Sequence, residues 1–130
     1  MTNLIKVLYD KIPFYTTLGF ELKEIADGVA IFEIEIKEKL TQNGMIHGAV
    51  LASLIDSTCA CAAFSLILPN GYATTIDLRV EYIRTVSKGR LKAKAKCVKS
   101  GKNIFFCKAK IWDDNGRLIC TGSSQLLRLQ

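Results

Sequence analysis

One apolar stretch, from His47 to Leu68, constrains the fold of this chain more than any other feature. It begins with the only histidine of the sequence, at the end of a polar turn, and its length suits a helix of about six turns. Asp56 is the one carboxylate in the stretch and is surrounded by Leu, Ile, Val, Ala and Cys. Burying an ionised, unpaired carboxylate costs several kcal/mol. The sequence therefore predicts a central helix in which Asp56 has a partner or a function.

Alternating apolar and polar residues on both sides of this stretch predict β-strands. Before it, residues 19–37 have the pattern of a hairpin with a turn at Asp27-Gly28. After it, four more strands separated by short turns are predicted at residues 74–82, 90–97, 104–112 and 117–129. Long strands joined by short turns form one antiparallel sheet, and its apolar face needs a cover.

We therefore expect an α+β fold in a single domain over residues 1–130, with the antiparallel sheet wrapped around a helix at residues 48–68. An N-terminal helix within residues 2–17 should end or kink at Pro13. The central stretch is also long enough to cross a bilayer. Asp56 near its middle would cost about 2.5–3.5 kcal/mol there, and the strands need a buried partner, so we expect a core helix and no membrane partner.

The start of the central helix offers chemistry. A helix N-terminus presents free N–H groups and a partial positive charge, so the Gly48 N–H is suited to stabilise a carbonyl oxygen that gains negative charge. Asp56 is the candidate base or nucleophile. Structural roles remain open for both: Gly48 easing the turn, and Asp56 paired with an arginine or with nearby hydroxyls. His47 either contacts substrate, orients the loop or caps the helix.

The spacing between Gly48 and Asp56 limits how they can cooperate. Eight residues of helix separate them by about 12 Å along the axis. A reacting carbonyl must lie roughly 3 Å from both the donor and the attacking group. Either the two residues do not act together, or two copies meet so that Gly48 of one faces Asp56 of the other, as a two-fold dimer would allow.

The segment Asn43-Gly44-Met45-Ile46-His47-Gly48-Ala49, with Asp56 nine residues after the histidine, resembles the signature of hotdog-fold acyl-CoA thioesterases. It is most similar to the PaaI-like group, which is related to the 4-hydroxybenzoyl-CoA thioesterases. The order of elements agrees over nearly the whole chain. The resemblance implies a hotdog fold and a homodimer with its site across the subunit interface. A dimer of dimers stays open.

The resemblance also implies roles for individual residues. Asp56 matches the catalytic carboxylate, as general base or nucleophile, and Gly48 matches the glycine whose N–H polarises the thioester carbonyl. His47 has a supporting role, and Thr75 matches a hydroxyl residue that helps to position the water.

Many members carry Asn or Gln six residues before the histidine, where this chain has Thr41, so either Gln42 or Asn43 takes the amide role. The usual second glycine is Ala49 here. We further expect Ser57 beside Asp56 to meet the substrate, and Arg84 and Lys88 near strand ends to meet the phosphates of coenzyme A.

The net charge of +6 suits nucleic acid, an anionic membrane or a nucleotide-tailed small molecule. Because the lysines alternate with core residues and not with exposed aromatics, we expect no nucleic-acid partner. The stripe Lys92, Lys94 and Lys96 is interpreted as a solvated sheet face.

The five cysteines are odd in number and lie in apolar or alternating runs, which is typical of reduced thiols and a cytoplasmic location. Cys59-Ala60-Cys61 lacks the spacing of a zinc knuckle, so we expect no metal. We also expect no cofactor, since coenzyme A is part of the substrate.

Hydrolysis of an acyl-CoA thioester is the leading hypothesis for function. Acyl dehydratases and hydratases share the fold, but their His–acid spacing differs and the chain has no second histidine. The alternative is a non-catalytic acyl-CoA-binding sensor or interaction module on the same fold. The acyl group is left open by the sequence, although Ser53 and Ala60 of the central helix are expected to line its pocket.

Overall fold

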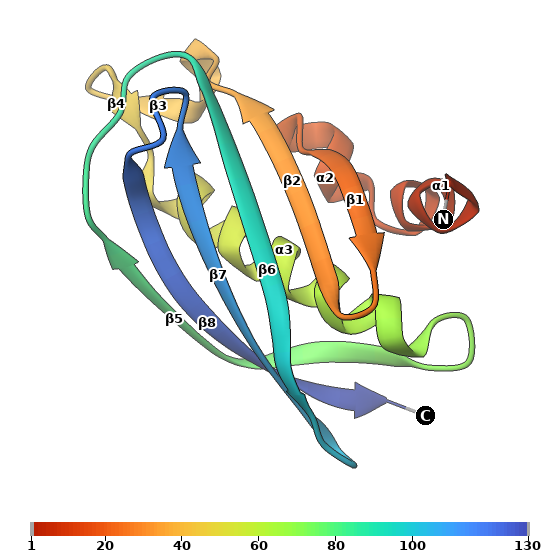
Figure 1. The fold of residues 1–130 in the computed structure, drawn as a ribbon. Helices are drawn as coiled ribbons and strands as arrows, with labels where there is room; N and C mark the ends of the chain where they lie inside the picture. Colours follow the sequence, from red (N-terminus) through yellow and green to blue (C-terminus); the bar gives the residue numbers. More distant parts are fainter. Residues whose placement is uncertain (1, 130) are drawn as a thin grey trace.

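The structure, a computed structural model, describes the backbone of residues 2–129 and the side chains of residues 4–129. Its elements follow one another along the chain as shown in Figure 1. They are α1 (Thr2–Lys11), α2 (Pro13–Leu18), β1 (Glu21–Ala26), β2 (Val29–Glu35), the 3-10 helix η1 (Glu38–Leu40), β3 (Thr41–Gln42), β4 (Met45–Ile46), α3 (Gly48–Ile67), β5 (Tyr72–Tyr82), β6 (Arg90–Ser100), β7 (Ile104–Asp113) and β8 (Leu118–Leu129).

Six strands form one sheet in the order β1-β2-β6-β7-β8-β5, and every neighbouring pair is antiparallel. The sheet curls around α3, with α1 and α2 beside its β1 edge (Figure 1). Helix α3 packs against strands β1, β2, β5, β6, β7 and β8. This arrangement confirms the predicted antiparallel sheet around a long central helix, preceded by an N-terminal helix.

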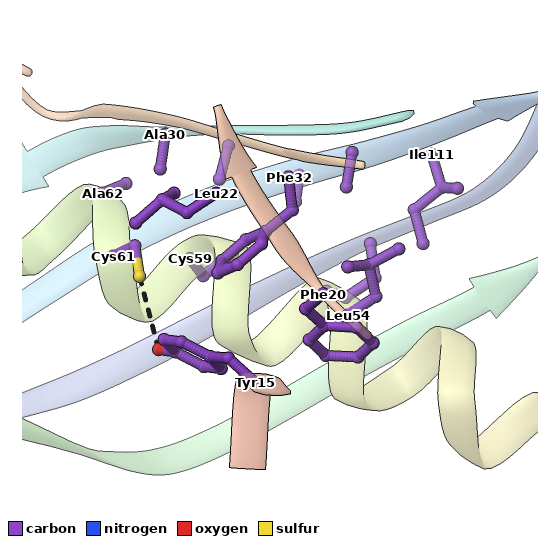
Figure 2. Close-up of a cluster of buried hydrophobic side chains, with 14 of the residues drawn as sticks. Tyr15, Phe20, Leu22, Ala30, Phe32, Leu54, Cys59, Cys61, Ala62 and Ile111 are labelled. Atoms are coloured by element: carbon purple, nitrogen blue, oxygen red, sulfur yellow. Dashed lines mark hydrogen bonds between the residues drawn. The ribbon is translucent and has the colours of Figure 1, made fainter. Parts of the chain in front are cut away.

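Helix α3 begins where the sequence predicts and ends one residue earlier, before Leu68 and Pro69. Its side chains Leu54, Ile55 and Cys59 are fully buried, and aromatic residues from α2, the linker before β1 and β2 lie beside it (Figure 2). By length and composition the helix is apolar enough to cross a membrane, but 61% of its most apolar window is buried inside the fold. Its apolar character is therefore explained by the core.

The N-terminal helix is interrupted at Pro13, as predicted. Helix α1 ends at Lys11, and α2 begins with Pro13 in its first turn, where the missing N–H costs nothing. The hydroxyl of Tyr9 on α1 donates to the carbonyl of Phe20 and accepts from the N–H of Leu22, and both hydrogen bonds are 2.6 Å long. These bonds fix α1 against the start of β1.

The polar turn predicted before α3 is present, and it is flanked by two short strands that the sequence did not predict. Residues 41–46 form a small hairpin, β3–β4, in which Asn43 (φ 53°) and Gly44 (φ 76°) occupy the turn. Two consecutive residues with positive φ suit a tight hairpin turn, and Asn-Gly is the preferred pair for it. Strands of two residues are too short to show alternation, which is why the pattern missed them.

Strand β6 is longer than the predicted residues 90–97 because it contains a bulge. Its pairing with β7 shifts between Cys97 and Lys99, and the strand continues to Ser100. A bulge inserts one residue and reverses the in-and-out alternation beyond it. The period of two therefore breaks down three residues before the strand ends.

All five cysteines are free, and four of them are buried in the core. Burial raises the pKa of the Cys59 and Cys61 thiols to about 12. A thiol that stays protonated is a poor nucleophile, so these two cysteines act as small apolar side chains.

Gly122 on β8 is packed tightly between the backbone of β5 and helix α3. A Cβ at this position would lie 2.6 Å from the carbonyl oxygen of Arg79 and 2.8 Å from a methyl group of Ile55. We expect Gly122→Ala to lower the free energy of unfolding by about 1–3 kcal/mol, because the backbone of β5 has to move. Gly71→Ala is the control, since the nearest atom is 3.6 Å away. Equal denaturation midpoints for the two variants would contradict this account.

Candidate active site

Asp56 lies in the middle of α3 and is held by hydroxyl groups from the sheet. Its Oδ1 accepts from Thr75 Oγ1 on β5 at 2.7 Å and from Ser124 Oγ on β8 at 3.4 Å. Within residues 4–129, no lysine or arginine nitrogen lies within 4.0 Å of the carboxylate. Asp56 is therefore not neutralised by an ion pair, and the hydroxyls that bind it are not those of Ser57 and Thr58, its neighbours on the helix.

Asp56 lines a cavity of about 360 Å³ between α3, β5 and α2. Its Oδ2 accepts no hydrogen bond from the described residues. Ser57 and Thr75 also line the cavity, as do Ser53 and Ala60, so the predicted lining residues of α3 lie together. One carboxylate oxygen is thus fixed by donors and the other is free to bind a proton or a water molecule.

The cavity that Asp56 lines also has an aromatic wall. It consists of Phe14, Tyr15, Phe64 and Tyr72. Phe64 and Tyr72 stack with their ring centroids 4.6 Å apart, and Phe14 is 45% exposed. Burial raises the pKa of Tyr15, whose hydroxyl lies 3.3 Å from Cys61 Sγ (Figure 2). Tyr15 therefore serves as a neutral wall of the cavity.

The first turn of α3 forms a second cluster. His47 is the N-cap, and its Nδ1 accepts from the Ala49 N–H at 2.9 Å. His47 thus caps the helix, one of the three roles considered for it. Within the described chain, the Gly48 N–H has no hydrogen-bond acceptor. It is a free donor at the positive end of the helix dipole.

Tyr82 of β5 and Arg84 share a cavity of about 290 Å³ with Gly48. The Tyr82 hydroxyl donates to the Gly48 carbonyl oxygen at 3.0 Å, and the ring packs over the glycine. Lys88 is exposed on the same β5–β6 loop, which is tied to β4 by a hydrogen bond from the Ile46 N–H to the Val86 carbonyl.

Gln42 and Asn43 are exposed on the β3–β4 hairpin, beside the start of α3 but outside the cavity of Asp56. Asn43 occupies a turn position with positive φ, which accounts for its residue type on structural grounds. Thr41, which stands where many family members have an amide, donates its hydroxyl to the Glu38 carbonyl at 2.7 Å.

The predicted site residues therefore fall into two groups, which contact α3 at two different points along its length. Asp56, Ser57 and Thr75 line one cavity, and Gly48 and Arg84 line the other. Eight residues of α3 separate Gly48 from Asp56, which is about 12 Å along the axis. A single chain does not bring the free N–H and the carboxylate to one reacting carbonyl.

Sequence reasoning missed Ser124, Tyr82 and the aromatic wall. Ser124 is 1% exposed and lies on the side of β8 that faces α3, where a polar residue interrupts the apolar pattern. That interruption is the signal in the sequence that could have identified it. Tyr82 gave no such signal, because tyrosine is common at strand ends.

Residues 43–120 match the thioesterase superfamily. A 1,4-dihydroxy-2-naphthoyl-CoA hydrolase of Listeria monocytogenes is 26% identical over 105 residues, which span 80% of this chain and 85% of the relative. Among solved structures, the protein Rv1847 of Mycobacterium tuberculosis is similar with a TM-score of 0.87 and 26% identity, over 91% of this chain and 97% of that one. The thioesterase HI1161 of Haemophilus influenzae has a TM-score of 0.89 at 19% identity, over 97% of this chain and 90% of that one.

The family match covers more than half of the chain and includes α3 with Gly48 and Asp56 and the strands β5 to β7. The structural similarity extends over nearly the whole fold. The chain belongs to the thioesterase superfamily and is a thioester hydrolase with the hotdog fold.

Proposed function

We propose that the chain hydrolyses an acyl-CoA thioester, with Asp56 as general base and the Gly48 N–H as the donor to the thioester carbonyl oxygen. The observation that carries this proposal is the state of Asp56. It is a carboxylate with no cationic partner among residues 4–129, its Oδ1 accepts a hydrogen bond from Thr75, and the residue lines a cavity of substrate size.

In the proposed reaction, Asp56 takes a proton from a water molecule as the water oxygen attacks the thioester carbon. The carbonyl oxygen gains a negative charge, which the Gly48 N–H stabilises. The C–S bond then breaks, the sulfur leaves as the thiolate of coenzyme A, and the proton held by Asp56 passes to it. Free acid and coenzyme A are the products, and the carboxylate is regenerated.

The proposal requires a second copy of the chain, and β5 is suited to bind it. This strand pairs with β8 on one side and, among the described strands, has no partner on the other. Ile76, Tyr82 and Ile83, on β5 and just after it, are each more than 50% exposed. A long, apolar and unpaired edge strand readily pairs with another chain.

A two-fold pairing of β5 with itself would complete the site. If the axis passes through Arg79, antiparallel pairing across the bulge between Thr75 and Asp77 places Thr75 opposite Tyr82 of the partner subunit. Thr75 binds Asp56, and Tyr82 binds Gly48. The carboxylate of one protomer then lies beside the free N–H of the other, and the arrangement occurs twice. Light scattering should give the mass of at least two chains, and a monomer that hydrolyses acyl-CoA would contradict this part of the proposal.

The head of α3 supplies the remaining assignments. We assign the amide role of the family to Gln42, because Asn43 is required by the hairpin turn. Arg84 and Lys88 lie on one loop beside this end of α3, where the phosphates of coenzyme A would extend from a thioester bound at Gly48. His47 keeps the helix start in place by capping it.

The acyl group is proposed to be aromatic. Phe64 and Tyr72 form a stacked pair in a cavity whose only carboxylate is Asp56. An aromatic acyl group packed against such walls gains more binding free energy than its buried area alone would provide. The Listeria relative, named for a naphthoyl-CoA substrate, supports the same class.

Thiol release from short, long and aryl acyl-CoAs tests this proposal. We expect hydrolysis with the highest kcat/KM for aryl acyl-CoA. Higher kcat/KM for straight chains would contradict the assignment of the acyl group and leave the reaction intact. Tight binding of every acyl-CoA without thiol release would contradict hydrolysis and favour the acyl-CoA-binding module.

Thr75→Val should lower kcat by about tenfold, because a hydrogen bond to a charged group contributes about 1.5–3 kcal/mol and Val keeps the shape of the side chain. Ser124→Ala is the matched control, since its longer bond of 3.4 Å predicts a smaller loss. The thiol-release assay should therefore show a larger fall in kcat for Thr75→Val than for Ser124→Ala. A larger loss for Ser124→Ala would show that Thr75 does not hold the carboxylate in its active position.

A further inference from the structure

The outer face of the sheet, away from α3, contains a groove of about 410 Å³ that the proposed reaction does not use. Strands β6 and β7 cross in front of α3 in Figure 1, so this face is turned toward the viewer. Ala95, Ala109 and Gly122 are small residues at the floor of the groove. The groove runs across β6, β7, β8 and β5, which spans three strand spacings or about 14 Å.

Two rows of paired side chains form the walls, and the strand register defines both rows. One row contains Lys94, Lys110, Thr121 and Glu81, and the other contains Lys96, Lys108, Ser123 and Arg79. Residues two apart along a strand are about 7 Å apart, so the rows are separated by that distance. The interpretation of Lys94 and Lys96 as a simple solvated stripe did not include their cross-strand neighbours.

The charge in this groove is unbalanced. Five of the residues that line it are cationic and only Glu81 is acidic. Within residues 4–129, none of the five forms an ion pair or a side-chain hydrogen bond. Lys94 lies directly opposite Lys110, and Lys96 directly opposite Lys108. Like charges directly opposite in a sheet destabilise the fold. A bound anion would relieve this repulsion between the lysines.

Trp112 lines one end of the groove and adds an aromatic surface next to the cations. The hydroxyls of Thr121 and Ser123 add hydrogen-bond donors to the two rows. Ammonium groups and hydroxyls bind phosphate oxygens, and an indole stacks on a nucleobase. Both chemistries occur together in one ligand class.

We propose that this groove binds a nucleoside polyphosphate, with its phosphates between the two lysine rows and its base against Trp112. The site is separate from the acyl-CoA cavity, because α3 and Asp56 lie on the opposite face of the sheet. The ligand bridges Lys94 and Lys96 on β6 to Lys108 and Lys110 on β7.

Two larger anionic partners fit the groove less well. An anionic membrane surface is bound best by cations flanked by exposed apolar side chains. None of the large exposed apolar residues that the structure describes lines this groove. A nucleic-acid strand needs a track longer than this recess, whose volume is in the range of small-molecule sites.

The fluorescence of Trp112, the only tryptophan of the chain, provides a direct readout. Titration with ATP should quench it saturably, and added salt should weaken binding because the contacts are ionic. Inorganic tripolyphosphate should compete with ATP, since it occupies the lysine rows alone. ATP should also raise the unfolding temperature of the wild type.

The double variant Lys96→Gln/Lys108→Gln should bind ATP about tenfold more weakly or worse. Without ATP it should unfold at the same or a higher temperature, because an opposed pair of like charges is gone. Lys6→Gln/Lys11→Gln makes the same change of charge on α1 and should bind ATP as the wild type does. The two variants separate a local site from the general attraction of a basic protein.

Four results would overturn the proposal. They are the absence of saturable quenching at millimolar ATP, equal ATP affinity in Lys96→Gln/Lys108→Gln, equal weakening by Lys6→Gln/Lys11→Gln, and groove-dependent binding of anionic phospholipid vesicles or RNA in place of ATP. The test is independent of hydrolysis, because no acyl-CoA is present and the quenching is measured in the folded chain.

Discussion

Asp56→Asn lowers the rate of thiol release from acyl-CoA by about 10²–10⁴-fold, the contribution typical of a positioned general base. Asn keeps the size of the side chain and can still accept from the Thr75 hydroxyl through its carbonyl oxygen. What it loses is the ability to take a proton from water. The variant should therefore keep its secondary structure, its oligomeric state and its KM while kcat falls.

Asp10→Asn is a suitable control for this prediction. Asp10 is an exposed carboxylate on α1, so the substitution changes the net charge equally but not the cavity. Circular dichroism and light scattering on both variants separate loss of chemistry from loss of fold. Turnover of Asp56→Asn at the wild-type rate would show that another group supplies the base.

Much of the fold was predictable because the long apolar helix and the long strands have clearly different sequence patterns. Helix α3 is a single apolar run bounded by a polar turn and Pro69, and strands β6, β7 and β8 are each ten or more residues long. A sheet with one dry face and one helix long enough to cover it leaves few arrangements. Asp56 was identifiable for the same reason, since a carboxylate in a buried run is conspicuous.

The rest depended on contacts between residues far apart in the sequence. Thr75 and Ser124 lie 19 and 68 positions from Asp56, and only the order of strands brings both to its Oδ1. The family resemblance identified Thr75 but not Ser124. The lysine rows on the outer face likewise exist only in the register of β6 with β7. A pattern read along one strand cannot show which charges meet across two strands.

Gly48→Pro removes the proposed oxyanion donor without disturbing the helix. Proline lacks the N–H and is favoured at the first position of a helix, and His47 already has the extended backbone (φ −69°, ψ 132°) that a following proline requires. We expect kcat to fall by about 10²–10³-fold, the loss seen when an oxyanion donor is removed. Gly48→Ala is the matched control. It keeps the N–H, and its Cβ would lie 3.5 Å from the Tyr82 ring, an ordinary contact, so its kcat should stay near that of the wild type.

Mixed dimers then decide whether the two groups act across the interface. In a dimer of one Gly48→Pro chain and one Asp56→Asn chain, one site combines both substitutions and the other contains neither. Random pairing of equal amounts makes half of the dimers mixed, so co-expression should restore about a quarter of wild-type activity from two nearly inactive chains. If each chain contained its own complete site, every site in the mixture would carry one substitution and no activity would return. Loss of activity in Gly48→Ala equal to that in Gly48→Pro would instead show that space at Gly48, and not its N–H, is what the reaction needs.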